Sequence, residues 1–253
     1  MSLDADRITY AGHGTVLVEV DGARLLTDPL LRRRVGPLAR HVPPPQPAIA
    51  ENLDAILISH LHRDHADLGS LRRIGRRTPL LVPPGSRRFF ERHGFDAVTE
   101  LGPGDSASAG RLTVIATEAV HDGGRRRFAS RPEAIGFLVE GRRRIYFAGD
   151  TDLFPGMAHF GPGLDLALLP IWGWGPSIGS GHLDPERAAR AAALLSPRAA
   201  VPIHWGTLYP IGLARLHGSP LRSPGPEFVE QMQRLAPQVD VRVLAPGETL
   251  SLA

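Results

Sequence analysis

The sequence predicts an α/β or α+β chain in which β-sheets pack on each other and helices lie outside them. Short runs rich in Val, Ile and Leu recur along the chain at strand length, and helical segments lie between the later runs. The chain has 253 residues, of which 42% are hydrophobic and 22% charged. These values are ordinary for a globular domain of this length. We therefore expect a single domain over residues 1–253.

The expected strands follow from β-branched and apolar composition bounded by turn residues. In chain order they are Val16–Val20, Arg24–Thr27, Ala55–Ser59, Leu80–Val82, Leu112–Thr117, Ile135–Glu140, Ile145–Ala148, Leu166–Pro170, Ala200–Ile203, Val241–Leu244 and Thr249–Leu252.

The expected helices are Leu68–Ile74, Ser86–Arg92, Pro185–Leu195 and Glu227–Leu235. The third has the clearest start, because Asp184 can cap it and Pro185 suits the first helical position. Glu186 also suits the first turn, where the helix dipole favours negative charge.

No segment has the length or composition of a membrane anchor. The most apolar stretch, Leu166 to Trp172, is far shorter than the roughly 18 residues of a membrane span. Met1 to Asp6 has early charge and no apolar segment, unlike a signal peptide. We expect a cytoplasmic protein without a transmembrane segment.

All basic residues are Arg, and the formal net charge is +3. Arginine clusters at Arg32–Arg34, Arg125–Arg127 and Arg142–Arg144 admit two interpretations. They could bind phosphate or nucleic acid, or they could be ordinary solvated faces in an Arg-rich composition. The small net charge and the lack of interleaved aromatic residues favour the second interpretation and make nucleic acid an unexpected partner. Arg32–Arg34 follows Asp28–Pro29 and could still reach a substrate phosphate.

The strongest functional signal is the segment Ser59–His65, which reads Ser-His-Leu-His-Arg-Asp-His after an apolar run. His60 and His62 are two residues apart and face the same way on an extended chain. Asp64 and His65 fall in the following turn. Imidazole and carboxylate donors suit zinc, iron or manganese, and four donors in six positions favour two metals over one. The alternative is a chance His-rich surface turn. The absence of cysteine excludes thiolate ligands and a cysteine nucleophile.

Three more ligand-type residues each follow an apolar strand run. His121 follows Leu112–Val120, Asp150 follows Ile145–Gly149, and His204 follows Ala200–Ile203. Singly, each is more typical of a hydrogen-bonded core or loop residue. Together they indicate strands that deliver ligands to one sheet edge, where open sheets place their sites.

The ordered set of these residues resembles the five motifs of the metallo-β-lactamase superfamily. The set is Asp28, His60, His62, Asp64, His65, His121, Asp150 and His204. Three local segments are similar to the branch that contains ascorbate-6-phosphate lactonase-like proteins and N-acyl-phosphatidylethanolamine phospholipase D enzymes. They are Gly12–Thr15, Gly181–Pro185 and Ile203–Thr207. The resemblance implies a four-layer αββα sandwich with the site at one edge.

The resemblance also implies a role for each ligand. His60, His62 and His121 would hold one divalent metal ion, and Asp64, His65 and His204 a second, with Asp150 bridging them. Zinc is the expected metal, with manganese and iron as alternatives. Di-iron electron-transfer relatives have Glu at the position of His62, which argues against a redox protein.

Further residues have expected roles around the metals. Asp28 would orient a ligand by hydrogen bonds, or it could simply cap a turn. His13 has either the same orienting role or a structural one. Asp64 and His182 are the candidate catalytic groups, since Asp64 could orient the water or pass its proton, and His182 could protonate a leaving group or contact the substrate. The alternative for His182 is a packing role at the helix start. Trp172, Trp174 and Tyr209 could line an apolar pocket wall, or be ordinary buried aromatics.

These features predict a hydrolase that uses a dinuclear metal site to activate water for attack on an ester, lactone or phosphodiester. The expected partner is a small-molecule or lipid-like substrate, whose identity the fold does not fix. The alternatives are a nuclease-type phosphodiesterase and a non-catalytic metal-binding module of the same fold.

Overall fold

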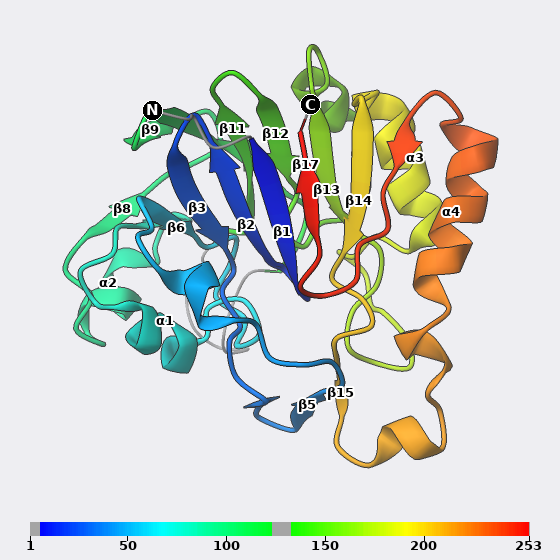
Figure 1. Ribbon diagram of the computed structural model, residues 1–253, viewed down its shortest axis with the longest axis horizontal. Helices are drawn as coiled ribbons and strands as arrows, with labels where there is room; N and C mark the ends of the chain where they lie inside the picture. The colour runs from blue at the N-terminus through cyan, green and yellow to red at the C-terminus, as the bar shows by residue number, and fades with distance from the viewer. Residues whose placement is uncertain (1–5, 123–132, 253) are drawn as a thin grey trace.

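The structure is a computed structural model that describes residues 6–122 and 133–252. Two seven-stranded sheets pack face to face (Figure 1). In spatial order, the first sheet consists of β17 (Thr249–Ser251), β1 (Arg7–Gly12), β2 (Thr15–Val20), β3 (Ala23–Thr27), β6 (Ala55–Leu57), β7 (Leu80–Val82) and β8 (Val98–Glu100). The second consists of β16 (Asp240–Val241), β14 (Ala199–Ile203), β13 (Leu166–Pro170), β12 (Arg144–Phe147), β11 (Ile135–Glu140), β10 (Leu112–Glu118) and β9 (Ser106–Ala109).

Helices cover the outer face of each sheet. The helices α1 (Leu68–Ile74) and α2 (Arg87–Glu91) pack on the first sheet, and α3 (Pro185–Leu195) and α4 (Pro224–Leu235) pack on the second (Figure 1). Four 3₁₀ turns complete the described helical elements, at Pro47–Ala50, Pro155–Phe160, Leu213–Arg215 and Ser219–Leu221. The predicted αββα order of four layers is confirmed.

Three apolar layers hold this arrangement together. The central one joins the facing sides of the sheets, for example Val18 and Leu57 with Phe137 and Leu168. The layer outside the second sheet contains the alanine-rich face of α3, whose small side chains allow the helix to lie close to the sheet. Burial of apolar surface at about 25 cal/mol per Å² is the main stabilising term for such layers.

The strand directions bring the predicted ligands to one edge. β3 runs parallel to β6, and β12, β13 and β14 run parallel to one another. β10 is antiparallel to β11, which is antiparallel to β12, so β10 and β12 point the same way. The carboxyl ends of β3, β6, β10, β12 and β14 therefore share an edge, and the loops that leave them contain the candidate ligands.

A small third sheet lies below this edge (Figure 1). It consists of β15 (Leu208–Pro210), β5 (Leu38–Arg40) and β4 (Arg34–Val35). Leu30, Val35, Leu38 and Leu208 form its own buried cluster. None of these three strands was predicted, because each is short and the pairing of β5 with β15 joins segments distant in the sequence.

Most predicted elements are confirmed within one or two residues, with two exceptions toward the carboxyl end. The helix predicted at Glu227–Leu235 begins three residues earlier, at Pro224. Val241–Leu244 is not a strand over its predicted length, because β16 ends at Val241. β16 lies at the edge of its sheet, and Leu244 leaves that edge to pack against the central core. Within the described residues, no helix is long and apolar enough to cross a bilayer.

Candidate metal centre

The His-rich loop begins just after β6, and Ile58, the residue that follows this strand, is fully buried. The backbone N–H groups of His65 and Ala66 both donate to the carbonyl of His62, which closes a turn. Asp67 then caps α1 by accepting from the backbone N–H of Ser70 at 2.8 Å. A buried strand on one side and a capped helix on the other fix the loop, so its side chains are held in place.

Three histidines converge at the first cluster. His60 Nε2 lies 2.9 Å from His62 Nδ1, and His121 Nε2 lies 3.3 Å from the same atom. His60 is fully buried, and His62 and His121 are partly buried. The predicted first ligand set is therefore together in space, although His121 is distant in the sequence.

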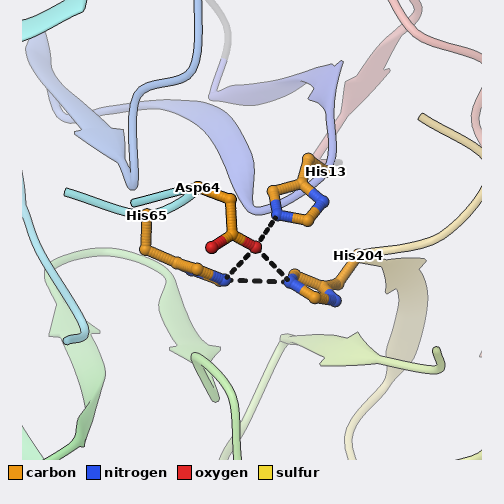
Figure 2. A group of neighbouring side chains, drawn as sticks. All are labelled: His13, Asp64, His65 and His204. Carbon is orange, nitrogen blue, oxygen red and sulfur yellow. Dashed lines mark hydrogen bonds and ion pairs between the residues drawn. The ribbon is translucent and has the colours of Figure 1, made fainter. Parts of the chain in front are cut away.

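The second cluster contains the other predicted ligands and one additional histidine (Figure 2). His65 Nε2 lies 2.9 Å from His204 Nε2. Asp64 Oδ2 lies 3.6 Å from His65 Nε2 and 3.9 Å from His204 Nε2. The additional residue is His13, whose Nε2 lies 3.0 Å from Asp64 Oδ2.

Asp150 lies between the two clusters. Its Oδ2 is 3.9 Å from His60 Nε2 and 3.3 Å from His65 Nε2, and its Oδ1 is 3.3 Å from His204 Nε2. Oδ1 is buried and has no hydrogen-bond partner among the described residues. Because a buried carboxylate oxygen is costly to leave without a partner, this donor set fits two divalent cations with a carboxylate between them.

The outer ring nitrogens of four histidines are fixed by hydrogen bonds. Each donates to one acceptor: Ser59 Oγ for His60 (2.9 Å), Asp28 Oδ2 for His65 (2.7 Å), the Gly181 carbonyl for His121 (2.7 Å) and the Trp172 carbonyl for His204 (2.9 Å). A proton on this Nδ1 atom leaves the lone pair on Nε2, which faces the cluster. The tautomers are therefore set for metal binding.

Asp28 occupies the predicted orienting position. Its Oδ1 accepts from the backbone N–H of Ser59 at 2.8 Å, and its Oδ2 accepts from Ser59 Oγ at 2.6 Å and from His65 Nδ1. Asp28 thus connects to His60 through Ser59 and to His65 directly. Sequence reasoning assigns no role to Ser59, although its position directly before His60 was a signal.

The pKa values of the imidazoles are perturbed in two directions. Burial lowers the pKa of His60 well below its usual value, lowers those of His62 and His121, and lowers that of His204 to about 3. These rings are neutral near pH 7 and can donate a lone pair. Burial would also lower the pKa of His65, but Asp150, Asp28 and Asp64 outweigh it and raise that pKa well above the usual value.

The two carboxylates remain charged. Burial would raise the pKa of Asp64 and of Asp150, but the adjacent histidines outweigh it and hold both pKa values well below the usual range. Two buried carboxylates at the centre of a histidine cluster favour a bound cation.

The backbone is strained where the ligands leave their strands. His13, Asp28 and His204 have φ values of 58°, 32° and 60°, a region that non-glycine residues rarely adopt. Gly149 has φ 60°, and a Cβ there would lie 2.6 Å from the Cβ of Ser59. Only glycine fits at that position, directly before Asp150.

His182 lies at the edge of the first cluster. Its Nε2 is 3.7 Å from Asp150 Oδ2, and its side chain is 25% exposed. It lines a hollow of about 200 Å³ together with His62, Asp64 and His204. The structure therefore brings the predicted catalytic histidine to the site with its ring accessible.

The three predicted aromatic residues differ in position. Trp174 lines the same hollow and is 42% exposed. Trp172 donates from Nε1 to the Gly175 carbonyl, so its ring is held within its own loop. Tyr209 is buried and donates its hydroxyl to the His217 carbonyl. Of the three, Trp174 is the one found in the described hollows at the metal centre.

Four arginines of the predicted clusters form ion pairs, namely Arg32 and Arg142–Arg144. Arg32 donates to Asp67 Oδ2 at 2.8 Å, so its guanidinium does not extend toward the site. The cluster Arg142–Arg144 pairs with acidic residues of neighbouring segments, chiefly Asp6 and Glu140. Arg125–Arg127 lies outside the described residues.

Comparison with known proteins agrees with this geometry. The sequence profile of the Beta-lactamase superfamily domain matches residues 23–205. The chain belongs to the metallo-β-lactamase superfamily. Among solved structures, the metallo hydrolase Igni18 of Ignicoccus hospitalis has a TM-score of 0.75 and 26% identity, with 98% of this chain and 99% of that one covered.

Relatives of this metallo-β-lactamase superfamily member include a UPF0173 metal-dependent hydrolase of Rubrobacter xylanophilus. It is 32% identical over 261 residues, which cover 98% of this chain and 97% of that protein. N-acyl-phosphatidylethanolamine-hydrolyzing phospholipase D 1 of Caenorhabditis elegans is 32% identical, over 84% of this chain and 67% of its own length. A Mycobacterium tuberculosis protein is 36% identical over 81% of this chain, and the match spans 60% of its length.

Proposed function

We propose that this chain hydrolyses an ester, lactone or phosphodiester with a two-cation site, expected to hold zinc. The observation that supports this most directly is Asp150, whose carboxylate oxygens face both histidine clusters. The names of relatives that align over nearly the whole chain, such as the Rubrobacter metal-dependent hydrolase, agree with the proposal.

The two clusters divide the expected ligands. His60, His62 and His121 would hold one cation, and Asp64, His65 and His204 the other, with Asp150 between them. When bound, such cations lower the pKa of water to roughly 7 and polarise a substrate oxygen. Metal uptake must displace the proton of His65, whose pKa is raised. Metal affinity should therefore increase with pH up to that pKa.

His13 is proposed to position Asp64. Its Nε2–H donates to Asp64 Oδ2 at 3.0 Å, and its carbonyl accepts from the backbone N–H of His204 at 2.9 Å. Its ring also lies against that of His204, with the centroids 3.9 Å apart. His13 thus holds two ligands of the second cluster in one orientation, while Asp64 orients the attacking water and accepts its proton.

His182 is proposed to deliver a proton to the leaving group. Its Nδ1 lies 3.3 Å from the Gly179 carbonyl, which orients the ring so that Nε2 faces the hollow. Ser177 lines the same hollow and adds a polar group beside the reacting bond. A histidine that lines the hollow can donate its proton directly to an alkoxide leaving group bound there.

The test is hydrolysis of p-nitrophenyl acetate, a simple lactone and bis-p-nitrophenyl phosphate before and after chelation. We expect turnover of at least one of them to fall at least about a hundredfold on metal removal, because the cations supply most of the electrostatic stabilisation. Added zinc or manganese should restore it. Undiminished activity after complete chelation would contradict the proposal, and no turnover by fully metallated protein would favour the non-catalytic module. Salt-dependent binding of RNA or DNA would favour the nuclease alternative.

A further inference from the structure

An apolar hollow of about 410 Å³ adjoins the metal centre. One wall is the β4–β5 hairpin, Val35–Leu38, and the other contains Trp174. The floor is the segment His62–Asp64 of the metal-binding loop. Its volume is within the range of small-molecule sites.

The hairpin wall is firmly held. Val35 and Leu38 are buried against Leu30 and Leu208. β5 pairs with β15, and beyond the end of β15 the backbone N–H of Ile211 donates to the Pro37 carbonyl at 3.0 Å. A wall anchored on both sides can form a preformed binding surface.

This apolar hollow meets the hollow that contains His182. His62, Asp64 and Trp174 line both. A molecule that spans them would place its reacting bond beside Asp150 and His182 and its apolar part against the hairpin. The junction lies over two expected metal ligands, so the apolar hollow belongs to the substrate path.

Arg63 lies between His62 and Asp64, which line both hollows. It is exposed and lines the apolar hollow. Within residues 6–122 and 133–252 it is the one arginine that lines either hollow, and no hydrogen bond or ion pair of its side chain is found there. Arg32, in contrast, is paired with Asp67. Within the described part of the chain, the Arg63 guanidinium therefore has no acidic partner, and it lies beside an apolar surface.

We propose that Arg63 and the hairpin hollow select an amphipathic anion as substrate. The apolar body lies between Trp174 and the hairpin, and an anionic group pairs with the Arg63 guanidinium, whose planar donors suit a carboxylate, sulfonate or phosphate. This inference rests on the proposed function only in calling the bound anion a substrate. The binding preference itself can be measured without turnover.

The experiment measures binding of 1-octanesulfonate and of octan-1-ol to metal-loaded protein by titration calorimetry. We expect the wild type to bind the sulfonate more tightly than octanol. Arg63→Ala should lower the affinity for the sulfonate roughly threefold to tenfold, as for a partly exposed charge pair. Octanol binding should not change in that variant. Arg63→Lys should retain part of the preference for the sulfonate over octanol. Trp174→Ala should lower the affinity for both probes.

Arg72→Ala is the matched control, because Arg72 is an exposed arginine on α1 that lines neither hollow. It should leave both affinities unchanged. Equal affinities for the two probes in the wild type would overturn the proposal. An unchanged sulfonate affinity in Arg63→Ala would also overturn it, since the anion would then lie on the metal ions. If the metal-loaded wild type hydrolyses no substrate but still prefers the sulfonate to octanol, the proposed function is contradicted and this inference stands.

Discussion

Asp150→Asn should lower turnover by roughly 10²–10³-fold and remove at least one cation from the protein. The amide that replaces the carboxylate has no charge, and only one of its two terminal atoms can bind a metal. In the wild type, both oxygens of Asp150 lie within 4 Å of histidine Nε2 atoms from the two clusters. Loss of this charge weakens the binding of both cations and, with it, the stabilisation of the developing oxyanion. Metal analysis and steady-state kinetics on one sample measure both effects.

Asp67→Asn is the control for Asp150→Asn. Asp67 is also buried and also in the loop region, but it caps α1 and pairs with Arg32. Asn still caps a helix, so metal content should stay at the wild-type level. If Asp150→Asn retained both cations and full turnover, the bridging role would be wrong.

His182→Ala should lower kcat by roughly 10²-fold on substrates with poor leaving groups, with metal content unchanged. His182 Nε2 lies 3.7 Å from Asp150 Oδ2, and His182 forms a further group of possible ligand atoms with His121 and Asp150, but neither proposed ligand set includes it. Its ring is partly exposed and lines the hollow of about 200 Å³ at the metal centre. Its loss should therefore affect a proton transfer and spare cation binding.

The leaving group separates this role from a structural one. p-Nitrophenolate departs without protonation, so turnover of p-nitrophenyl acetate should fall only a few-fold in His182→Ala. An alkyl ester needs a proton on its leaving oxygen and should show the full loss. His159→Ala serves as the control, because His159 is exposed and lines neither hollow. Equal losses on both substrates would show that His182 acts by holding the loop.

Much of the fold follows from the sequence because its central strands are short apolar runs. β13 and β14 are buried on both faces, and their composition shows it. β1 was missed because Arg7 and Thr9 interrupt its apolar residues, and its pairing with β2 and β17 supplies the remaining stabilisation. Such pairing is a tertiary effect that local composition does not contain.

The candidate ligands were predictable because His121, Asp150 and His204 each follow an apolar run, and because the His-rich segment Ser59–His65 resembles a known family motif. The surroundings were not. Arg63 lies between two candidate ligands, but its position beside the hairpin depends on the third sheet. Trp172 and Trp174 are equivalent by composition, and only the path of their loop places one in the hollow and bonds the other to Gly175.

The most direct test of the two-cation site is the metal content of gently purified protein, measured with hydrolysis on the same sample for the wild type and His62→Ala. We expect about two divalent cations per wild-type chain. His62 Nδ1 lies close to both other histidines of the first cluster, so the variant should keep about one cation and lose hydrolysis. Two cations and full activity in His62→Ala would contradict the assignment of the first cluster, and a fully active wild type with no bound metal would contradict the two-cation account.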